Sequence, residues 1–437
     1  MALAERTLMD TSSEHAPAPE AATDSPPAPP SLDEQIARVR TTDVAVAFLT
    51  YNNAETLPGV VTSAAEGAAA FARDMAVTFI NVDAGSSDGT PVAVETAGLP
   101  CILTTHEAPI GERMAVPFHG VPGRGRALRT ALTVAQRLSA RAVLILEADV
   151  VSLTPDWVGR LATPVLEGKA DFVAPAYARH RFDGTMTNLL IAPLVRALYG
   201  RRIRQPLGGA QGLSARLVEH LLVHPRWEWS GRELADVWIL GTAIADGFSV
   251  SEAWLGPRIV RSHARTTDLP AMVSQTLGGV FSVMDRHDDL WREVRGSEPL
   301  AAVGEARLPS TEPREVDVDR MLNGFRLGLR DLTPVWEHAL APETLGDVLS
   351  LEPLGLRDFR FPDDLWARVV YDAALGHHYG VVYREHLLRS LVPLYLGRTA
   401  AYVLATRDRD AVASEAATEA VARAFEQQKP YLVERWT

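Results

Sequence analysis

The chain has 437 residues, of which 47% are apolar and 22% charged, and its formal net charge is −12 at pH 7. This length exceeds one average domain, so we expect a catalytic domain and a second module. The acidic balance argues against nucleic acid or acidic membranes as general partners, and no apolar run is long enough to span a bilayer. The single cysteine, Cys101, excludes an internal disulfide and indicates a reducing compartment.

The amino-terminal segment, residues 1–38, is rich in alanine, proline, serine and glutamate. It lacks the basic start and apolar middle of a secretory signal, so we expect a disordered tail and a cytoplasmic protein.

Strands alternate with helices from Val44 onward. The apolar runs 44–50, 77–82 and 142–146 are typical of buried strands, and 56–71 and 125–138 have the pattern of helices. Further helices at 187–199 and 233–247 precede a strand at 248–254. This alternation predicts an α/β domain over residues 39–292, with a mostly parallel sheet flanked by helices.

The character of the chain changes after about Asp289. Residues 293–318 are rich in proline, glutamate and arginine and are typical of a linker. Residues 319–437 then show helical periodicity with few strand signals, so we expect an all-helical carboxy-terminal module with a structural or oligomer-forming role. The stretches expected to be helical are 320–332, 363–375, 383–405 and 411–436.

Two acids follow the apolar strand at 142–146. Glu147 and Asp149 are separated only by Ala148, at the carboxyl end of a strand, where open α/β sheets bind ligands. Carboxylate oxygens suit Mg²⁺ or Mn²⁺, so this triplet predicts a divalent metal that carries a diphosphate.

Three loops between strands and helices have polar residues suited to a nucleotide. The loop 50–56 places Thr50 and Asn52 at a helix amino end, although a simple capping turn is the preferred explanation for this loop alone. Asp83 ends the second strand and is expected to accept hydrogen bonds from a base or ribose, whereas Asp88 is expected to shape the turn. In the third loop glycines flank Arg124 just before a helix, an arrangement that favours phosphate binding.

The motifs NNAET, VDAGSSDGT, PGRGRAL, LEADV and QPLGG have the order and spacing found in GT-A nucleotide-sugar glycosyltransferases. More narrowly, residues 44–289 are similar to the retaining glucosyl-3-phosphoglycerate synthase and mannosylglycerate synthase families. The resemblance implies a GT-A fold and a metal-bound nucleoside-diphosphate sugar. It also implies transfer of a hexose to a glycerate-type acceptor with retained configuration, the leaving diphosphate taking the acceptor's proton.

The resemblance assigns roles to individual positions. Asp149 matches a metal ligand, and His263 matches the histidine that completes the metal site. Glu147 stands where the family usually has aspartate and is expected to hold ribose or metal, while Asp236 is expected to position the acceptor or to support the transition state. The expected catalytic residues are Asp236 and Arg124. The expected donor-binding residues are Thr50, Asn52, Asp83, Arg124, Glu147, Ala148, Gly208, Gly209 and Gln211.

The chain departs from the family pattern in its donor and acceptor loops. Ala210 and Gln211 follow the two glycines where the family has glutamate, which removes a carboxylate from beside the hexose. In the acceptor loop Thr185 replaces an arginine that grips phosphate, and threonine cannot make that bidentate contact. A non-phosphorylated acceptor such as glycerate is therefore favoured, unless another arginine compensates. The acceptor-binding residues that we expect are Gly184, Thr185, Thr187 and Arg265, and the possible compensating arginines are Arg265, Arg181 and Arg179.

Two other functions compete with this prediction. A sugar-nucleotide pyrophosphorylase would need a glycine-rich loop after the first strand, and Tyr51-Asn52-Asn53 does not resemble one. A non-catalytic nucleotide-binding scaffold is the main alternative, because of Glu147 and the missing acid of the donor loop. The expected partners are a nucleoside-diphosphate hexose, a small hydroxy acid and further copies of the chain in a dimer or tetramer.

Overall fold

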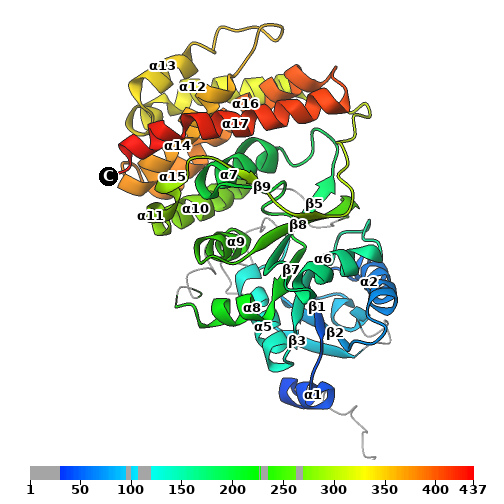
Figure 1. Ribbon diagram of the computed structural model, residues 1–437. Helices are drawn as coiled ribbons and strands as arrows, with labels where there is room; N and C mark the ends of the chain where they lie inside the picture. The colour runs from blue at the N-terminus through cyan, green and yellow to red at the C-terminus, as the bar shows by residue number, and fades with distance from the viewer. Residues whose placement is uncertain (1–29, 95–99, 107–119, 226, 228–234, 262–268) are drawn as a thin grey trace, which may run out of the picture.

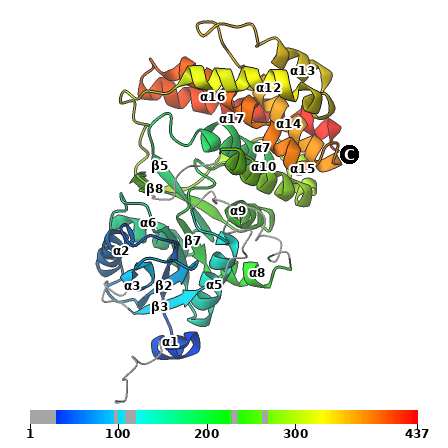
Figure 2. The ribbon, with the colours of Figure 1, turned by 180° about the vertical axis from the view of Figure 1, so that it is seen from behind.

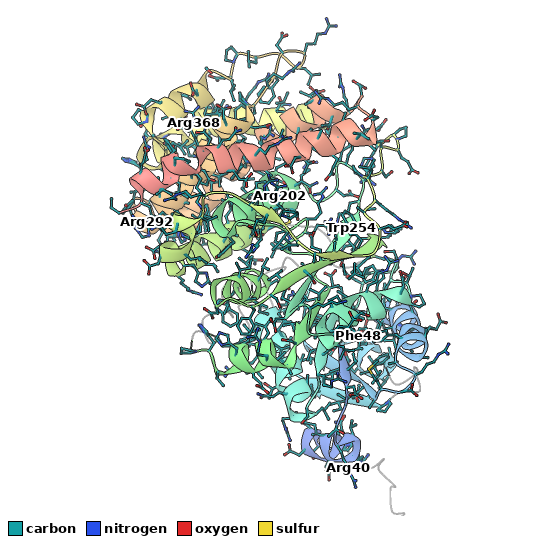
Figure 3. The ribbon with its side chains drawn as sticks, viewed as in Figure 1. Arg40, Phe48, Arg202, Trp254, Arg292 and Arg368 are labelled. Atoms are coloured by element: carbon teal, nitrogen blue, oxygen red, sulfur yellow. The ribbon has the colours of Figure 1, made fainter. Side chains whose placement is uncertain are left out.

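The structure is a computed structural model that describes residues 30–94, 100–106, 120–225, 227, 235–261 and 269–437. A sheet covered by helices forms one part of the molecule, and a group of long helices forms the other (Figures 1 and 2). In Figure 3 Phe48 lies in the sheet-containing part and Arg368 in the helical part. Among the described helices, none is long and apolar enough to cross a membrane.

In the described residues, eight strands form one sheet in the order β10-β8-β5-β7-β4-β1-β2-β3. β7 runs antiparallel to both of its neighbours, β4 and β5, while the other pairings in this sheet are parallel. The predicted mostly parallel α/β sheet is therefore confirmed. The strands are β1 (Val44–Thr50), β2 (Val77–Asp83), β3 (Cys101–Thr105), β4 (Ala142–Glu147), β5 (Phe172–Ala178), β7 (Gln211–Ser214), β8 (Val250–Pro257) and β10 (Ala302–Val303).

Helices cover both faces of this sheet, which explains why β1 is buried along its whole length and apolar up to Thr50. Val44, Val46 and Phe48 belong to the core on the side of α2 and α6, and the alternate residues of β1 belong to the core on the side of α5. The helices that pack in this part are α2 (Leu57–Phe71), α3 (Thr90–Ala93), α5 (Arg124–Arg137), α6 (Asp156–Leu166), α8 (Ala215–Val223) and α9 (Ala235–Ala245).

Residues 32–38 are helical, so the predicted disordered tail is wrong for the end of its range, while residues 1–29 lie outside the described residues. α1 (Leu32–Val39) begins with a capping box, in which Ser31 and Glu34 bond to each other's backbone amides. The Gln35 side chain accepts a hydrogen bond from the Leu103 amide (2.8 Å) and donates one to its carbonyl (3.0 Å). α1 thereby covers the edge strand β3, which would otherwise present unpaired backbone groups.

The predicted all-helical module is confirmed. Its helices are α12 (Val318–Ala339), α13 (Pro342–Leu349), α14 (Asp363–Tyr379), α15 (Arg384–Ser390), α16 (Val392–Thr406) and α17 (Ala411–Arg435). α13 was not expected, and the single helix expected over 383–405 is divided into α15 and α16 just before Pro393. Proline cannot donate a backbone hydrogen bond and disturbs the preceding turn, which accounts for a division at this point.

Several elements join the two parts. A π-helical turn, η2 (Thr187–Ile191), leads into α7 (Ala192–Tyr199), and both pack on α17; α10 (Leu269–Arg286) packs on α15 and is followed by α11 (Asp288–Glu293). The segment expected as a linker contains two short strands. One is β10, and the other is β9 (Glu298–Pro299), which pairs with β6 (Arg201–Arg202). The linker is thus attached to the sheet-containing part by hydrogen bonds.

Candidate functional site

The topology of the sheet gathers most of the predicted donor residues at one edge. β1, β2 and β4 run parallel and end at Thr50, Asp83 and Glu147. Because β7 is antiparallel, its first residue, Gln211, lies at this same edge and is paired with Ile145. The carboxyl ends of parallel strands are where open α/β sheets bind ligands.

A buried polar cluster joins Arg124, Asp236 and Gln211. Arg124 is the first residue of α5, after Gly123 in a left-handed conformation, and Asp236 lies in the first turn of α9. The Arg124 guanidinium donates to the two Asp236 carboxylate oxygens, from Nε at 2.8 Å and from Nη2 at 2.9 Å, and Gln211 Nε2 donates to Oδ1 at 2.6 Å. Asp236 is fully buried and Arg124 is 9% exposed. A sequence separation of 112 residues between the acid and the arginine hid this pair from sequence analysis.

Several carboxylates act on the charge of Arg124. Burial lowers its pKa, but the negative charge and hydrogen bonds of Asp236 raise it, and Glu147 and Asp149 add smaller contributions in the same direction. The net direction is upward. The two predicted catalytic residues therefore form one ion pair, with the predicted metal-binding acids within its electrostatic reach.

The glycine loop 208–209 packs against this cluster. The Gly209 carbonyl accepts a hydrogen bond from Arg124 Nη2 (3.3 Å), and the Gly208 carbonyl accepts one from the Tyr177 hydroxyl (3.1 Å). Gly209 has a φ of +86°, and a Cβ there would lie 2.0–2.4 Å from the carboxylate atoms of Glu147. Only glycine permits this approach, so the loop and the acid are fitted to each other.

Arg258 is a residue of the site that sequence analysis missed. It follows directly after β8 and contacts Glu147 Oε2 through Nη2 (2.6 Å) and Nε (3.1 Å). Burial lowers the pKa of Arg258, but the charge of Glu147 raises it, and the net shift is upward. Glu147, predicted to hold ribose or metal, is thus already paired with a cation. A basic residue immediately after a strand was the available signal for Arg258.

Asp149 is half-buried just past β4. Its carbonyl accepts a hydrogen bond from the Arg261 amide (2.9 Å), and Val150 forms an isolated bridge with Val260. His263 and Arg265 follow soon after Arg261 but lie outside the described residues, so their predicted roles stay predictions. Among the described residues, no group of three histidine, cysteine, aspartate or glutamate side chains gathers at metal-binding distance. The carboxylate of Asp149 is of the donor type that Mg²⁺ and Mn²⁺ prefer.

The first two predicted nucleotide loops are bonded to each other. Thr50 Oγ1 lies 3.1 Å from Asp83 Oδ2, and Asp83 Oδ1 accepts from the amides of Gly85 (2.9 Å) and Ser86 (2.7 Å). Asn52, with a φ of +53°, donates its amide to Ser86 Oγ at 2.8 Å. These contacts shape the turns beside the edge of the sheet.

Two further predictions in this region concern Asp88 and Ala148. Asp88 accepts from the Ala54 amide at 3.0 Å and also bonds to Thr90, as expected for a residue that shapes the turn. The buried Ala148 accepts a hydrogen bond from Thr56 at 2.7 Å through its carbonyl.

The predicted acceptor loop is attached to the helical module. Thr185 Oγ1 lies 2.6 Å from the Tyr395 hydroxyl of α16, and Thr187 is buried at the start of η2. Gly184, with a φ of +66°, adjoins the Arg179 guanidinium. Arg181 donates to the carbonyls of Thr406, Arg409 and Thr311, and it therefore closes the end of α16.

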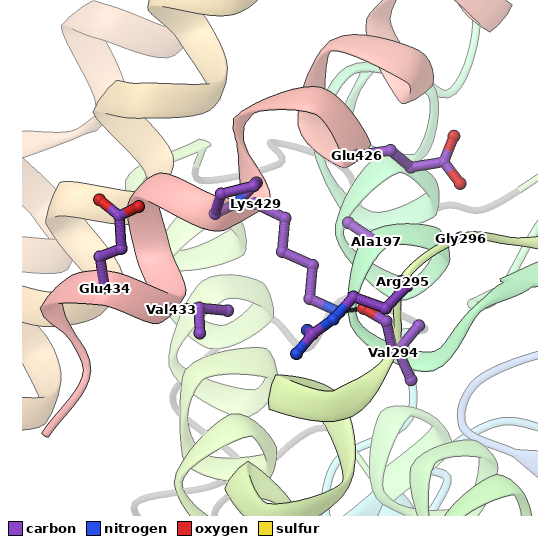
Figure 4. Close-up of a pocket in the computed structure, with 9 residues that line it drawn as sticks. Ala197, Val294, Arg295, Gly296, Glu426, Lys429, Val433 and Glu434 are labelled. Atoms are coloured by element: carbon purple, nitrogen blue, oxygen red, sulfur yellow. Dashed lines mark hydrogen bonds between the residues drawn. The ribbon is translucent and has the colours of Figure 1, made fainter.

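A cavity of about 290 Å³ lies between α7 and α17 (Figure 4). Lys429 reaches across it and donates to the Val294 carbonyl at 2.7 Å, and burial lowers its pKa to about 8. Arg295, Glu426 and Glu434 also line this cavity. It is formed by different elements from the edge of the sheet, and no sequence motif indicated it.

No family model and no curated protein matches the chain. The chain is similar to solved structures of glucosyl-3-phosphoglycerate synthase from Mycobacterium tuberculosis, the family that the motifs resemble. A complex of that enzyme with Mn²⁺, UDP and glucosyl-3-phosphoglycerate is 22% identical to this chain in sequence. The match covers 59% of this chain and 84% of the enzyme's chain, with a TM-score of 0.42. A complex with Mg²⁺ and UDP has the same identity and coverage and a TM-score of 0.43. A complex with Mn²⁺, UDP-glucose and glycerol 3-phosphate gives the same identity, the same coverage and the same TM-score of 0.43.

Proposed function

We propose that the chain is a GT-A glycosyltransferase that moves a hexose from a nucleoside-diphosphate sugar to a small hydroxy acid, with retained configuration. The observation that carries this proposal is the cluster of Arg124, Asp236 and Gln211 beside Glu147 and Gly209 at the carboxyl edge of the sheet. It combines buried charges and a close backbone approach where this class of sheet binds ligands. A site of this kind is also where strongly perturbed ionisable groups are expected.

In the proposed reaction the bond between the sugar C1 and the diphosphate oxygen breaks, and a bond from C1 to the acceptor oxygen forms on the same face. The acceptor's proton goes to the departing diphosphate. Arg124 would stabilise that diphosphate through guanidinium N–H groups not engaged with Asp236 and Gly209. Asp236 holds the guanidinium in place, and Gln211 is proposed to contact the hexose where the family has an acid.

Asp149 would hold Mg²⁺ or Mn²⁺, with Glu147 and His263 as the other proposed ligands. The cation would add positive charge beside the departing diphosphate. Because Glu147 is paired with Arg258, we assign the main metal contact to Asp149 and expect Glu147 chiefly to support the Gly209 loop.

A donor and acceptor screen tests this proposal. UDP-glucose, GDP-glucose and GDP-mannose are each incubated with Mg²⁺ or Mn²⁺ and with glycerate or 3-phosphoglycerate, and glycosylated product is detected by mass spectrometry. Asp149→Ala should abolish transfer, whereas the control Asp358→Ala, on an exposed loop, should not. Turnover by Asp149→Ala at the wild-type rate and limiting metal would contradict the assignment.

One observation favours the alternative of a non-catalytic nucleotide-binding scaffold. Glu147, an acid expected to bind a ligand, is already paired with Arg258. Tight nucleotide binding without transfer or hydrolysis across all acceptors would support the scaffold. Product formation with any donor would exclude it.

A further inference from the structure

Arg179 follows directly after β5, at the same edge of the sheet as Glu147 and Arg258. Its guanidinium carbon lies 5.5 Å from the centre of the Tyr177 ring, and that of Arg258 lies 5.8 Å from the same ring. A Cβ added to Gly184 would lie 2.7 Å from Arg179 Nη1, so the guanidinium touches the loop expected to bind the acceptor.

The Arg179 side chain has no hydrogen bond or ion pair to any residue in the described part of the chain, and its Nε is buried without a partner. Burial lowers the pKa of Arg179 to about 10, and repulsion from Arg258 contributes in the same direction. The guanidinium is still charged at neutral pH. The charges of Glu147 and Asp183 attract the guanidinium from a distance, but neither forms an ion pair with it. A mostly buried cation without an ion pair of its own is costly, so this position is suited to receive an anion.

The neighbouring arginines are already engaged. Arg258 pairs with Glu147 at 2.6 Å, Arg204 pairs with Glu415 at 3.0 Å, and Arg181 donates to backbone carbonyls. The nearby Asp183, on the acceptor loop, pairs with Arg314. Arg179 and Arg181 are the two arginines in the described residues that could compensate for Thr185, and of these only Arg179 makes no side-chain hydrogen bond or ion pair.

Water alone does not account for this arrangement. A cavity of about 10 Å³ beside Arg179 also contacts Arg204 and Gln205 and has room for about one water molecule. A water molecule there satisfies an N–H group but does not balance the charge.

We propose that Arg179 binds the acid group of the acceptor, a carboxylate or a phosphate, at the Gly184 loop. The inference rests on the proposed function for the identity of the acceptor, while the anion site itself does not depend on it. Arg179 would then replace, from a different position in the chain, the charge that is absent at Thr185. Its planar guanidinium suits bidentate contact with either acid group.

Thermal unfolding tests the anion site independently of activity. Wild type, Arg179→Met, Arg179→Lys and the control Arg357→Gln, an exposed arginine, are each melted with and without inorganic phosphate, glycerate and neutral glycerol. We expect Arg179→Met to melt at a higher temperature than wild type in the absence of anion, because it removes the unbalanced charge. Anions should raise the melting temperature of wild type and Arg357→Gln, less that of Arg179→Lys, and not that of Arg179→Met. The proposed anion site would be refuted if Arg179→Met melts at a lower temperature than wild type without anion. It would also be refuted if anions raise the melting temperature of Arg179→Met as much as that of wild type.

Transfer kinetics test its role toward the acceptor. With whichever donor wild type uses, Arg179→Met should raise the KM for glycerate or 3-phosphoglycerate about tenfold to a hundredfold and leave the donor KM unchanged. A larger effect with 3-phosphoglycerate would identify phosphate as the bound group, and a larger effect with glycerate the carboxylate. An unchanged acceptor KM would refute the inference even if transfer is observed. Absence of transfer by wild type would instead refute the proposed function, and the melting experiment would still decide the anion site.

Discussion

The ion pair between Arg124 and Asp236 makes a quantitative prediction about stability. Asp236→Asn keeps the size of the side chain but removes the charge opposite a guanidinium 2.8 Å away, in a site where the acid is fully buried. It also turns an acceptor into a donor facing Arg124 or Gln211, which both donate to this carboxylate. Removing one member of a buried pair typically costs about 3–5 kcal/mol, because the other charge is left uncompensated. We expect a loss of unfolding free energy of about that size.

A double-mutant cycle separates this effect from lost packing. Arg124→Met alone leaves the buried Asp236 carboxylate without its cation, whereas Arg124→Met with Asp236→Asn removes both charges of this pair. The double variant should therefore lose less unfolding free energy than the two single variants lose together. We expect this difference from additivity to be about 2–3 kcal/mol. Urea unfolding followed by tryptophan fluorescence measures the three variants, and Asp408→Asn, whose aspartate is 88% exposed, is the matched control. Additive single effects, or an Asp236→Asn midpoint equal to that of the control, would refute this explanation of the cluster.

Two further predictions concern Gly209, which packs against the cluster, and Glu252 of β8, whose carboxylate accepts a hydrogen bond from the Arg204 amide. Gly209→Ala should be clearly more destabilising than Gly168→Ala in urea unfolding: both have positive φ, which costs alanine about 1–2 kcal/mol, but only Gly209 faces a carboxylate within 2.4 Å. Equal losses would show that Glu147 moves aside freely. Burial raises the pKa of Glu252 to about 7 from the ordinary 4.5. The folded state therefore retains a proton that the unfolded state loses between these values, and stability falls as pH rises from 4.5 to 7. Glu252→Gln should lack this loss, which amounts to at most about 3 kcal/mol; urea midpoints that fall in parallel for both proteins would contradict it.

The sheet and the main part of the site were predictable because their signals are local. Apolar runs identified β1, β2 and β4, and the strand ends fixed Thr50, Asp83 and Glu147 at one edge before any pairing was known. The glycine before Arg124 likewise indicated the start of a helix, and α5 does begin there.

What the sequence did not reveal is which distant residues pair. The partners of Glu147 and Arg124 lie 111 and 112 residues away, and no periodicity or spacing encodes such contacts. Gln211 illustrates the same limit: its substitution for an acid was visible, but its bond to Asp236 depends on the antiparallel entry of β7. The start of α1 was missed for another reason. The serine and glutamate of its capping box, Ser31 and Glu34, were present but were outweighed by the composition of residues 1–38.

The acceptor loop indicates what the helical module contributes. Thr185 contacts Tyr395 on α16, and the Leu189 carbonyl accepts from the Trp366 indole of α14 at 2.6 Å. Arg181 fastens the same loop to the end of α16. The donor side, by contrast, is built from strand ends and from α5 and α9, which belong to the sheet-containing part. If Arg179 and Gly184 bind the acceptor as proposed, their position depends on the module while the donor residues depend on the sheet. Changes at the contact between Thr185 and Tyr395 should then alter acceptor affinity and leave nucleotide affinity unaltered, so the module would act as part of the acceptor site.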